Sequence, residues 1–145
     1  MPQSVPKRVT AQELLQLPLF IDESPEAVDW ISNQMEVRRL EAGEVFVREG
    51  DPATEFHVIL EGEIHFRRDG DRSANVFVVA SGQAIGVLPF SRMKAWGARG
   101  WAVQATRIGA MNASHLRELV YRAPALAQRL VSEMTDRART FTRMR

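Results

Sequence analysis

Hydrophobic positions follow a helical spacing at both ends of the chain and an alternating spacing in the middle. Between residues 37 and 80 apolar side chains come in short runs with a period of two, separated by turns that contain glycine, such as Gly43, Gly50 and Gly62. Two more such runs are expected over 101–105 and 107–111. Short alternating strands at this spacing are typical of a sandwich or barrel. The pattern therefore predicts a mainly β domain with flanking helices.

The N-terminal part predicts two short helices after a disordered lead-in over residues 1–9. Thr10 and Glu13 have the spacing of a capping box, in which each side chain satisfies a free backbone N–H of the other residue. Ser24 and Pro25 mark a second helix start, because serine caps a helix and proline is tolerated at its first position.

The C-terminal part predicts a pair of helices. Ser114 is expected to cap the first, and Pro124 opens the second, which runs to the end of the chain. Six positions of this second helix have the heptad spacing of a dimer seam, weakened by one arginine. They are Ala127, Leu130, Met134, Arg137, Phe141 and Met144. We therefore expect residues 123–145 to form a helix for signalling or for homodimer formation.

Composition narrows the class of protein. The 145 residues are 45% hydrophobic, which suits one globular domain, and the net charge of +1 gives no overall attraction to nucleic acids or membranes. The chain has no cysteine and no apolar run of the roughly 20 residues that span a bilayer. We expect a cytoplasmic protein that contacts neither nucleic acid nor membrane. The arginines of the C-terminal helix are interpreted as a solvated face.

Catalytic and metal-binding patterns are missing from the sequence. It contains no nucleophile elbow, no phosphate-binding loop of the ATPase type and no HExxH motif. The three histidines have no metal-ligand spacing, and we expect His57 and His65 at solvent-facing or half-buried strand positions. The sequence therefore predicts a protein that is not an enzyme and has no metal site.

The segment GVLPFSRMK (86–94), followed by GARGWAV (97–103), has the composition of an anion-binding loop. Glycine, a hydroxyl group and three cations are crowded between two expected strands. Guanidinium groups and free backbone N–H groups are the ligands that proteins use for phosphate. The alternative for any one of these cations is a solvent-exposed side chain of a surface loop, with no role in binding.

The glycine positions within LEAGEVFVREGDPATEFHVILEGEIHF (40–66) resemble those of the cyclic nucleotide-binding domain, and the resemblance extends over roughly residues 10–135. It implies a jelly roll (double-stranded β-helix) with N-terminal helices and a closing helical pair. It also implies that residues 10–122 form the β-roll domain. The ligand would be a cyclic nucleotide or another small phosphate-bearing anion.

In that family the segment after these strands is the phosphate-binding cassette, here residues 86–101. Its pattern is a glycine, a glutamate, a short helix, and an arginine ahead of small residues and a strand. Gly86 matches the glycine and Arg99 is taken as the arginine, but Val87 replaces the glutamate that binds the ribose hydroxyl. Trp96 or Trp101 could stack on a base. The resemblance implies these ligand-binding residues: Gly86, Val87, Leu88, Ser91, Arg92, Arg99, Gly100 and Trp101.

A narrower resemblance is to the N-terminal sensor domains of certain bacterial histidine kinases, carried by SGQAIGVLPFSRM, TRIGAM and LVSEMTDRARTFTR. It implies a sensory module that passes ligand binding through its C-terminal helix to a kinase or other effector. The sequence holds no phosphoacceptor motif and no ATP lid, so no kinase activity is expected of it.

Two alternatives remain open. In the first, the domain is degenerate, its pocket is filled by Phe90 or Trp96, and it serves only for dimerisation or interaction. A cupin-like enzyme on a similar roll would need a histidine cluster inside the barrel, and the three histidines are not placed for one.

Overall fold

The computed structural model describes residues 8–70 and 76–143, and the side chains of the last helix up to residue 133. Residues 1–7 of the predicted lead-in lie outside the described part. Val9, which the sequence placed in that lead-in, is only 5% exposed and belongs to the core. The packed domain therefore begins no later than Val9.

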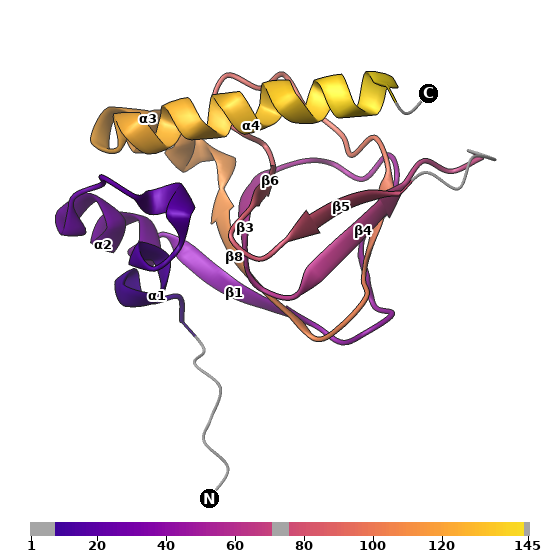
Figure 1. Cartoon of the computed structure of the whole chain (residues 1–145), viewed down its shortest axis with the longest axis horizontal. Helices are drawn as coiled ribbons and strands as arrows, with labels where there is room; N and C mark the ends of the chain where they lie inside the picture. Colours follow the sequence, from indigo (N-terminus) through magenta and orange to yellow (C-terminus); the bar gives the residue numbers. More distant parts are fainter. Residues whose placement is uncertain (1–7, 71–75, 144–145) are drawn as a thin grey trace, which may run out of the picture.

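Eight strands form two four-stranded antiparallel sheets that face each other. The first sheet contains, in spatial order, β1 (Met35–Leu40), β8 (Thr106–Asn112), β3 (Glu55–Glu61) and β6 (Ala84–Gly86). The second contains β2 (Val45–Val47), β7 (Arg99–Ala102), β4 (Glu63–Arg67) and β5 (Phe77–Ala80). The mainly β sandwich with flanking helices, predicted from the alternating pattern, is confirmed (Figure 1).

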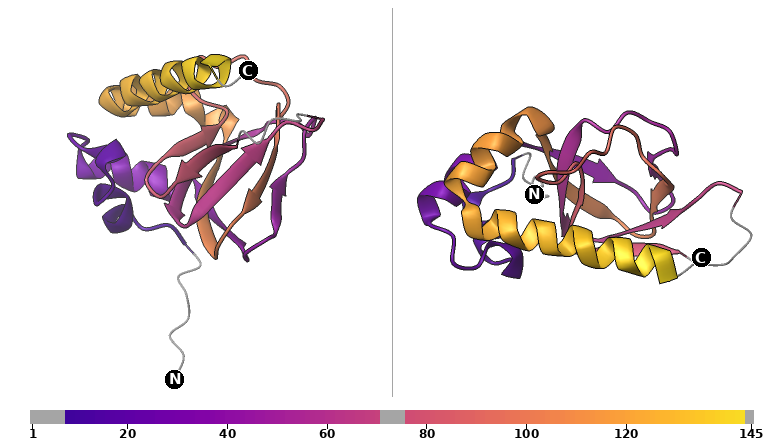
Figure 2. Two further views of the ribbon diagram at one scale, coloured as in Figure 1. Left: turned by 45° about the vertical axis from the view of Figure 1, so that its right-hand side comes forward. Right: turned by 90° about the horizontal axis from the view of Figure 1, so that it is seen from above.

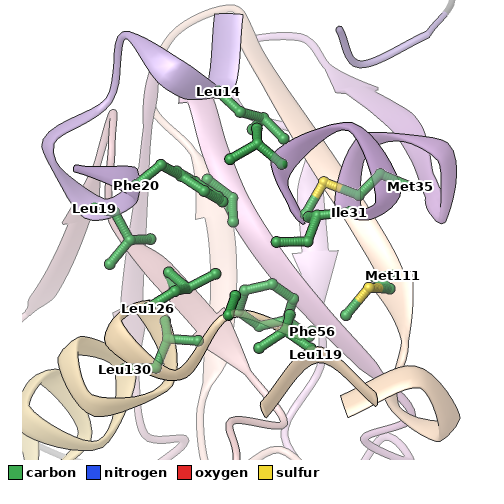
Figure 3. Close-up of a cluster of buried hydrophobic side chains, with 14 of the residues drawn as sticks. Leu14, Leu19, Phe20, Ile31, Met35, Phe56, Met111, Leu119, Leu126 and Leu130 are labelled. Carbon is green, nitrogen blue, oxygen red and sulfur yellow. The ribbon is translucent and has the colours of Figure 1, made fainter. Parts of the chain in front are cut away.

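The alternation along β3 divides the molecule into two cores. Phe56, Val58 and Leu60 point to a cluster shared with the helices, whereas Ile59 points to the cluster between the two sheets. Both faces of this strand are covered, so residues 56–60 are all buried. The cluster shared with the helices, called the outer cluster below, lies between the first sheet and the helices. In it Phe56 and Met111 meet Leu126 and other helical side chains (Figure 3).

The N-terminal helices start where the sequence predicts. Before α1 (Ala11–Leu15), the Thr10 hydroxyl accepts a hydrogen bond from the Glu13 N–H at 3.2 Å, and Glu13 accepts one from the Thr10 N–H at 3.0 Å. A 3₁₀ turn, η1 (Pro18–Phe20), leads to α2 (Pro25–Asn33), where the Ser24 hydroxyl accepts from the N–H of Ala27. Both caps are confirmed.

The closing helices are η2 (Ala113–His115), α3 (Leu116–Arg122) and α4 (Pro124–Arg143). The predicted cap at Ser114 is wrong, because the Asn112 side chain accepts from the N–H of Ser114 at 2.9 Å. Asn112 ends β8 in an extended conformation, so its side chain reaches the free N–H groups, whereas Ser114 already lies inside the turn. The start of α4 at Pro124 is confirmed.

The helices gather at one end and one side of the roll. In Figure 2, α4 runs along the roll, while α1 and α2 lie beside the N-terminal end of α4. Of the predicted heptad positions, Ala127 and Leu130 are buried against the chain's own core. The side chains of the later positions, from Met134 onward, lie outside the described residues. No helix in the described part is long and apolar enough to cross a membrane.

Candidate functional site

The cassette crosses from the first sheet to the second without a helix. Residues 87–98 form turns, bends and one isolated bridge between Pro52 and Ala95, in place of the short helix implied by the family pattern. Pro89 provides no N–H for a helix interior, and Phe90 takes a left-handed φ of +67° that interrupts helical geometry. The cassette therefore offers no helix N-terminus to a phosphate.

Gly86 brings the start of the cassette against β3. Its φ is +96°, and a Cβ at this position would lie 2.5 Å from the Glu55 carbonyl oxygen and 2.8 Å from Nδ1 of His57. The next residue, Val87, donates its N–H to the same carbonyl at 3.0 Å. This position requires glycine for both its conformation and its close packing.

The next predicted residues serve the local structure. Leu88 is 3% exposed, and both it and Val87 pack into the outer cluster. Ser91 donates its N–H to the Leu88 carbonyl and accepts from the N–H of Met93 at 3.1 Å. Arg92 is exposed to solvent.

The remaining predicted residues lie on β7 and divide between its two faces. Gly100 points inward and is covered by the Phe66 ring. Arg99 and Trp101 share the outer face of the second sheet, where the Arg99 guanidinium carbon lies 5.6 Å from the Trp101 ring centroid. The structure therefore does not bring the eight predicted residues together in one place.

Trp96 occupies the space between the sheets. Its indole is 6% exposed and stacks on Phe66, with 5.8 Å between ring centroids and 7° between planes. Phe46 meets it edge-on at 5.6 Å. Of the two residues that the degenerate alternative names, Trp96 therefore fills the interior, whereas Phe90 is 77% exposed.

His57 is the interior residue that the sequence interpretation missed. It is 4% exposed, so a solvent-facing or half-buried position is wrong for it, whereas His65 is half-buried as predicted. Its ring lies 4.9 Å from the Phe46 centroid and 5.9 Å from that of Trp96. The uninterrupted run FHVIL was the available signal, because a strand covered on both faces does not alternate in polarity.

A short chain of polar contacts leads from His57 to the rim of the roll. Nε2 of His57 lies 3.2 Å from the Glu55 carboxylate, whose other oxygen is 2.7 Å from Nη2 of Arg38. The hydrogen bond and electrostatic attraction of His57, together with the charge and hydrogen bond of Arg38, outweigh burial and hold the pKa of Glu55 below its ordinary value. Glu55 is therefore a carboxylate at neutral pH.

The cassette is connected to the last helix through the outer cluster. Leu88 belongs to the same continuous cluster as Leu126 and Leu130 of α4. In β6, the strand directly before the cassette, the N–H of Ala84 donates a hydrogen bond to the Glu133 carboxylate of α4 at 3.3 Å. The cassette and α4 therefore contribute side chains to one apolar cluster.

The two-sheet β-roll, with a turn-rich crossover after β6 and helices packed on one sheet, defines the class of the fold as a jelly roll with flanking helices. The chain belongs to the cyclic nucleotide-binding domain family, whose model matches residues 37–122. Members of this family are usually regulatory modules without catalytic activity.

Known proteins agree with this assignment. The chain is 26% identical over 114 residues to a putative potassium channel protein of Rhodopseudomonas palustris, covering 79% of this chain and 28% of that protein. It superimposes with a TM-score of 0.71 on the Thermus thermophilus catabolite activator protein, at 22% identity over 86% of this chain and 60% of the other.

A third similarity is to the N-terminal domain of a transcriptional regulator from Streptomyces coelicolor. The TM-score is 0.65 at 24% identity, covering 89% of this chain and 94% of that one. The two structural similarities show the jelly-roll fold with N-terminal and C-terminal helices.

Proposed function

We propose that this chain is a sensory module that binds a small phosphate-bearing ligand of the cyclic-nucleotide type and transmits binding through α4 to an effector such as a histidine kinase. Family membership supports the ligand class. The observation that carries the transmission step is that Leu88 of the cassette and Leu126 and Leu130 of α4 belong to one apolar cluster. A ligand shifts the docking of α4 by as much as it favours one cassette arrangement over another.

The charges of the cassette support a phosphate. Arg92, Lys94 and Arg99 are all exposed, so a phosphate from solvent can reach their cations. The Arg99 guanidinium lies over the Trp101 ring on the outer face of the second sheet. To contact a phosphate bound inside the roll, the Arg99 side chain must turn toward the edge of this sheet. Val87 provides no acceptor for a ribose hydroxyl, so another residue must accept the hydrogen bond from that hydroxyl.

The binding test is thermal unfolding with cAMP, cGMP, cyclic dinucleotides, ATP and inorganic phosphate in turn. A ligand at about 100 times its dissociation constant adds about 2.7 kcal/mol of stability. We expect a shift of several degrees with one nucleotide, and its loss in Arg99→Ala or Arg92→Ala. Arg117→Ala, an exposed arginine on α3, is the matched control. Unchanged affinity in both cassette variants contradicts the proposed phosphate contacts.

The transmission step has its own readout. Ligand binding is expected to change amide hydrogen exchange in the first turns of α4, and Leu88→Ala is expected to reduce that change while the ligand still binds. An equal response in the wild type and in Leu88→Ala would contradict transmission through this cluster.

A second candidate function is an interaction module with a permanently filled roll, and the position of Trp96 favours it. The backbone of Trp96 is held on both sides, by its N–H to the Asp51 carbonyl and by its carbonyl to the Gly50 N–H. Such a module gives no thermal shift with any nucleotide and associates through α4. Since Ala127 and Leu130 already face the chain's own core, sedimentation at increasing concentration tests whether the later turns form a dimer.

A further inference from the structure

The outer face of the second sheet carries a row of mainly apolar side chains that crosses all four strands. Cross-strand partners share a face. The pairing of the strands aligns four side chains, called the central row below: Val45, Trp101, His65 and Val78. Their neighbours along the strands, among them Phe46, Ile64 and Val79, pack between the two sheets, so the central row points outward. The rings of His65 and Trp101 meet edge-on, with 6.0 Å between centroids.

In the described part of the chain, the helices pack on the first sheet and leave this face open. Among residues 8–70 and 76–143, the outer cluster includes no side chain from β2, β4, β5 or β7. In Figure 1 the helices lie above and to the left of β4 and β5. Val45, Val78 and Val103 are 37%, 42% and 38% exposed. Apolar side chains gathered on one exposed face indicate a contact surface.

The charges on the two sides of the central row have opposite signs. On one side Arg67 and Arg99 are direct cross-strand partners, and neither forms an ion pair with another described residue. Two like charges in this position are unfavourable without a counter-charge. On the other side lies the Glu63 carboxylate, 35% exposed, which contacts His65 through Oε2 and leaves Oε1 free of described partners. The arginines therefore lack a carboxylate, and Glu63 has an oxygen to offer.

The spacing of these charges makes the face complementary to itself. Arg67 and Glu63 both lie on β4, two residues to either side of His65. When a second copy is turned by 180° about the central row, the two faces meet with each strand antiparallel to the same strand of the other copy. Arg67 of each copy then lies opposite Glu63 of the other, and the two central rows meet. A two-fold contact of one patch with itself is the commonest homodimer, and face-to-face sheets align in this way.

We propose that the outer face of the second sheet is a homodimer interface, in which two central rows pack together and Arg67 of each copy pairs with Glu63 of the other. A second copy fits this face better than a nucleic acid, because the central row offers no cations to a phosphate backbone and Glu63 repels it. The first turns of α4 pack in the outer cluster on the first sheet, so this interface is separate from the predicted heptad seam. It is also independent of the proposed ligand.

The size of the face sets the strength of the dimer. Strands about 4.8 Å apart, with rows about 7 Å apart along them, give a face on the order of 300 Å². Stable complexes bury about 800 Å² on each partner, so we expect a weak dimer that forms at about 0.1–1 mM chain. Sedimentation equilibrium measures this association. Amide NMR signals of β4, β5 and β7 are expected to shift with concentration, while those of α1 and α2 stay unchanged.

The charge pairing is tested with Arg67→Glu and Glu63→Arg, each of which brings like charges together at the interface. Each variant alone is expected to dimerise at least about tenfold more weakly than the wild type. An equimolar mixture of the two is expected to recover wild-type affinity, because each variant supplies the charge that the other has lost. The matched control is a mixture of Arg117→Glu and Glu26→Arg, which changes exposed positions on α3 and α2 by the same charges and is expected to behave as wild type.

The apolar contact is tested with Trp101→Ser, which is expected to abolish the dimer. Val78→Asp is the second variant if Trp101→Ser does not fold, because Val78 is exposed and its replacement leaves both cores intact. Arg99 is left unchanged in these experiments, since the proposed phosphate contact also uses it.

The outcomes separate this interface from the proposed function. A wild-type chain that stays monomeric at about 1 mM overturns the interface and leaves the proposed ligand binding in place. A dimer of unchanged affinity in Arg67→Glu and Val78→Asp also overturns it and places the association elsewhere, as in α4. If the mixture of Arg67→Glu and Glu63→Arg associates no better than either variant alone, the charge pairing is wrong. A charge-dependent dimer in a chain that no nucleotide stabilises confirms the interface, while the proposed sensing fails.

Discussion

Two glycines of the cassette show how differently single residues contribute to it. Gly86 has a left-handed φ of +96° and no room for a side chain, because a Cβ would lie 2.5 Å from a main-chain oxygen of β3. Gly97 has no left-handed φ and has open space around its Cβ position. In the sequence both are simply glycines in a loop.

We expect Gly86→Ala to lower the free energy of unfolding by about 1–3 kcal/mol, through backbone strain and the clash with β3. Gly97→Ala is expected to leave it unchanged or to raise it by about 0.4–1 kcal/mol, because alanine restricts the unfolded chain. Urea denaturation of both variants measures the difference. Equal effects would show that the approach of Gly86 to β3 is not tight.

At the scale of elements, α4 is held by hydrogen bonds to the N-terminal segment. The N–H of Leu126, in its first turn, donates to the Glu23 carboxylate at 2.8 Å. Arg129 donates to the carbonyl of Leu19 at 3.1 Å and to that of Ile21, at the end of η1. These contacts join α4 to residues about a hundred positions earlier and fix its direction across the roll.

Arg129→Met keeps the apolar stem and removes the donors, so it is expected to lower the free energy of unfolding by about 1–2 kcal/mol. Amide hydrogen exchange in the first turns of α4 is expected to increase more than exchange in β3. Arg117→Met on α3 is the control, expected to change stability by less than about 0.5 kcal/mol. Uniform acceleration across all elements would contradict a local role.

At the scale of the whole molecule, one buried ion pair joins α1 to the first sheet. Arg107 of β8 has an 8% exposed side chain and contacts Glu13 through both terminal guanidinium nitrogens, with Nη2 2.9 Å from Oε2. Burial alone would raise the pKa of Glu13, but the hydrogen bonds from Arg107 and Thr10 and the Arg107 charge together lower it below its ordinary 4.5.

This pKa shift predicts acid sensitivity with a definite sign. A carboxyl whose pKa is lowered by folding stabilises the folded state above its ordinary pKa, and this contribution is lost as the pH falls through the lowered value. Glu13→Gln keeps the capping box but loses the charge, so we expect about 1–3 kcal/mol less stability at pH 7 and a flatter profile below pH 5. Denaturation curves between pH 3 and 7 test this, with Glu49→Gln as control. Parallel profiles for Glu13→Gln and the wild type would contradict it.

Local sequence patterns predicted much of the fold but little of the candidate site. The capping box at Thr10, the cap at Ser24 and the start of α4 at Pro124 depend on neighbours within a few residues, and the structure has them as predicted. Arg99 and Trp101 share one face of β7, since residues two apart along a strand point the same way, whereas the sequence placed the start of this strand at Trp101. Which face they share was not readable, because both faces of β7 carry small or mixed side chains.

The sequence by itself determined the starts of α1, α2 and α4, how the strands alternate, and that the turns between them suit a β-roll, because period and capping are local properties. Only the tertiary structure decided that Trp96 lies between the sheets, that His57 is buried beside it, and that the first turns of α4 pack on the chain's own core. The physical reason is distance along the chain. The rings around Trp96 come from β2, β3 and β4, and only the closing of two sheets brings them into one slot.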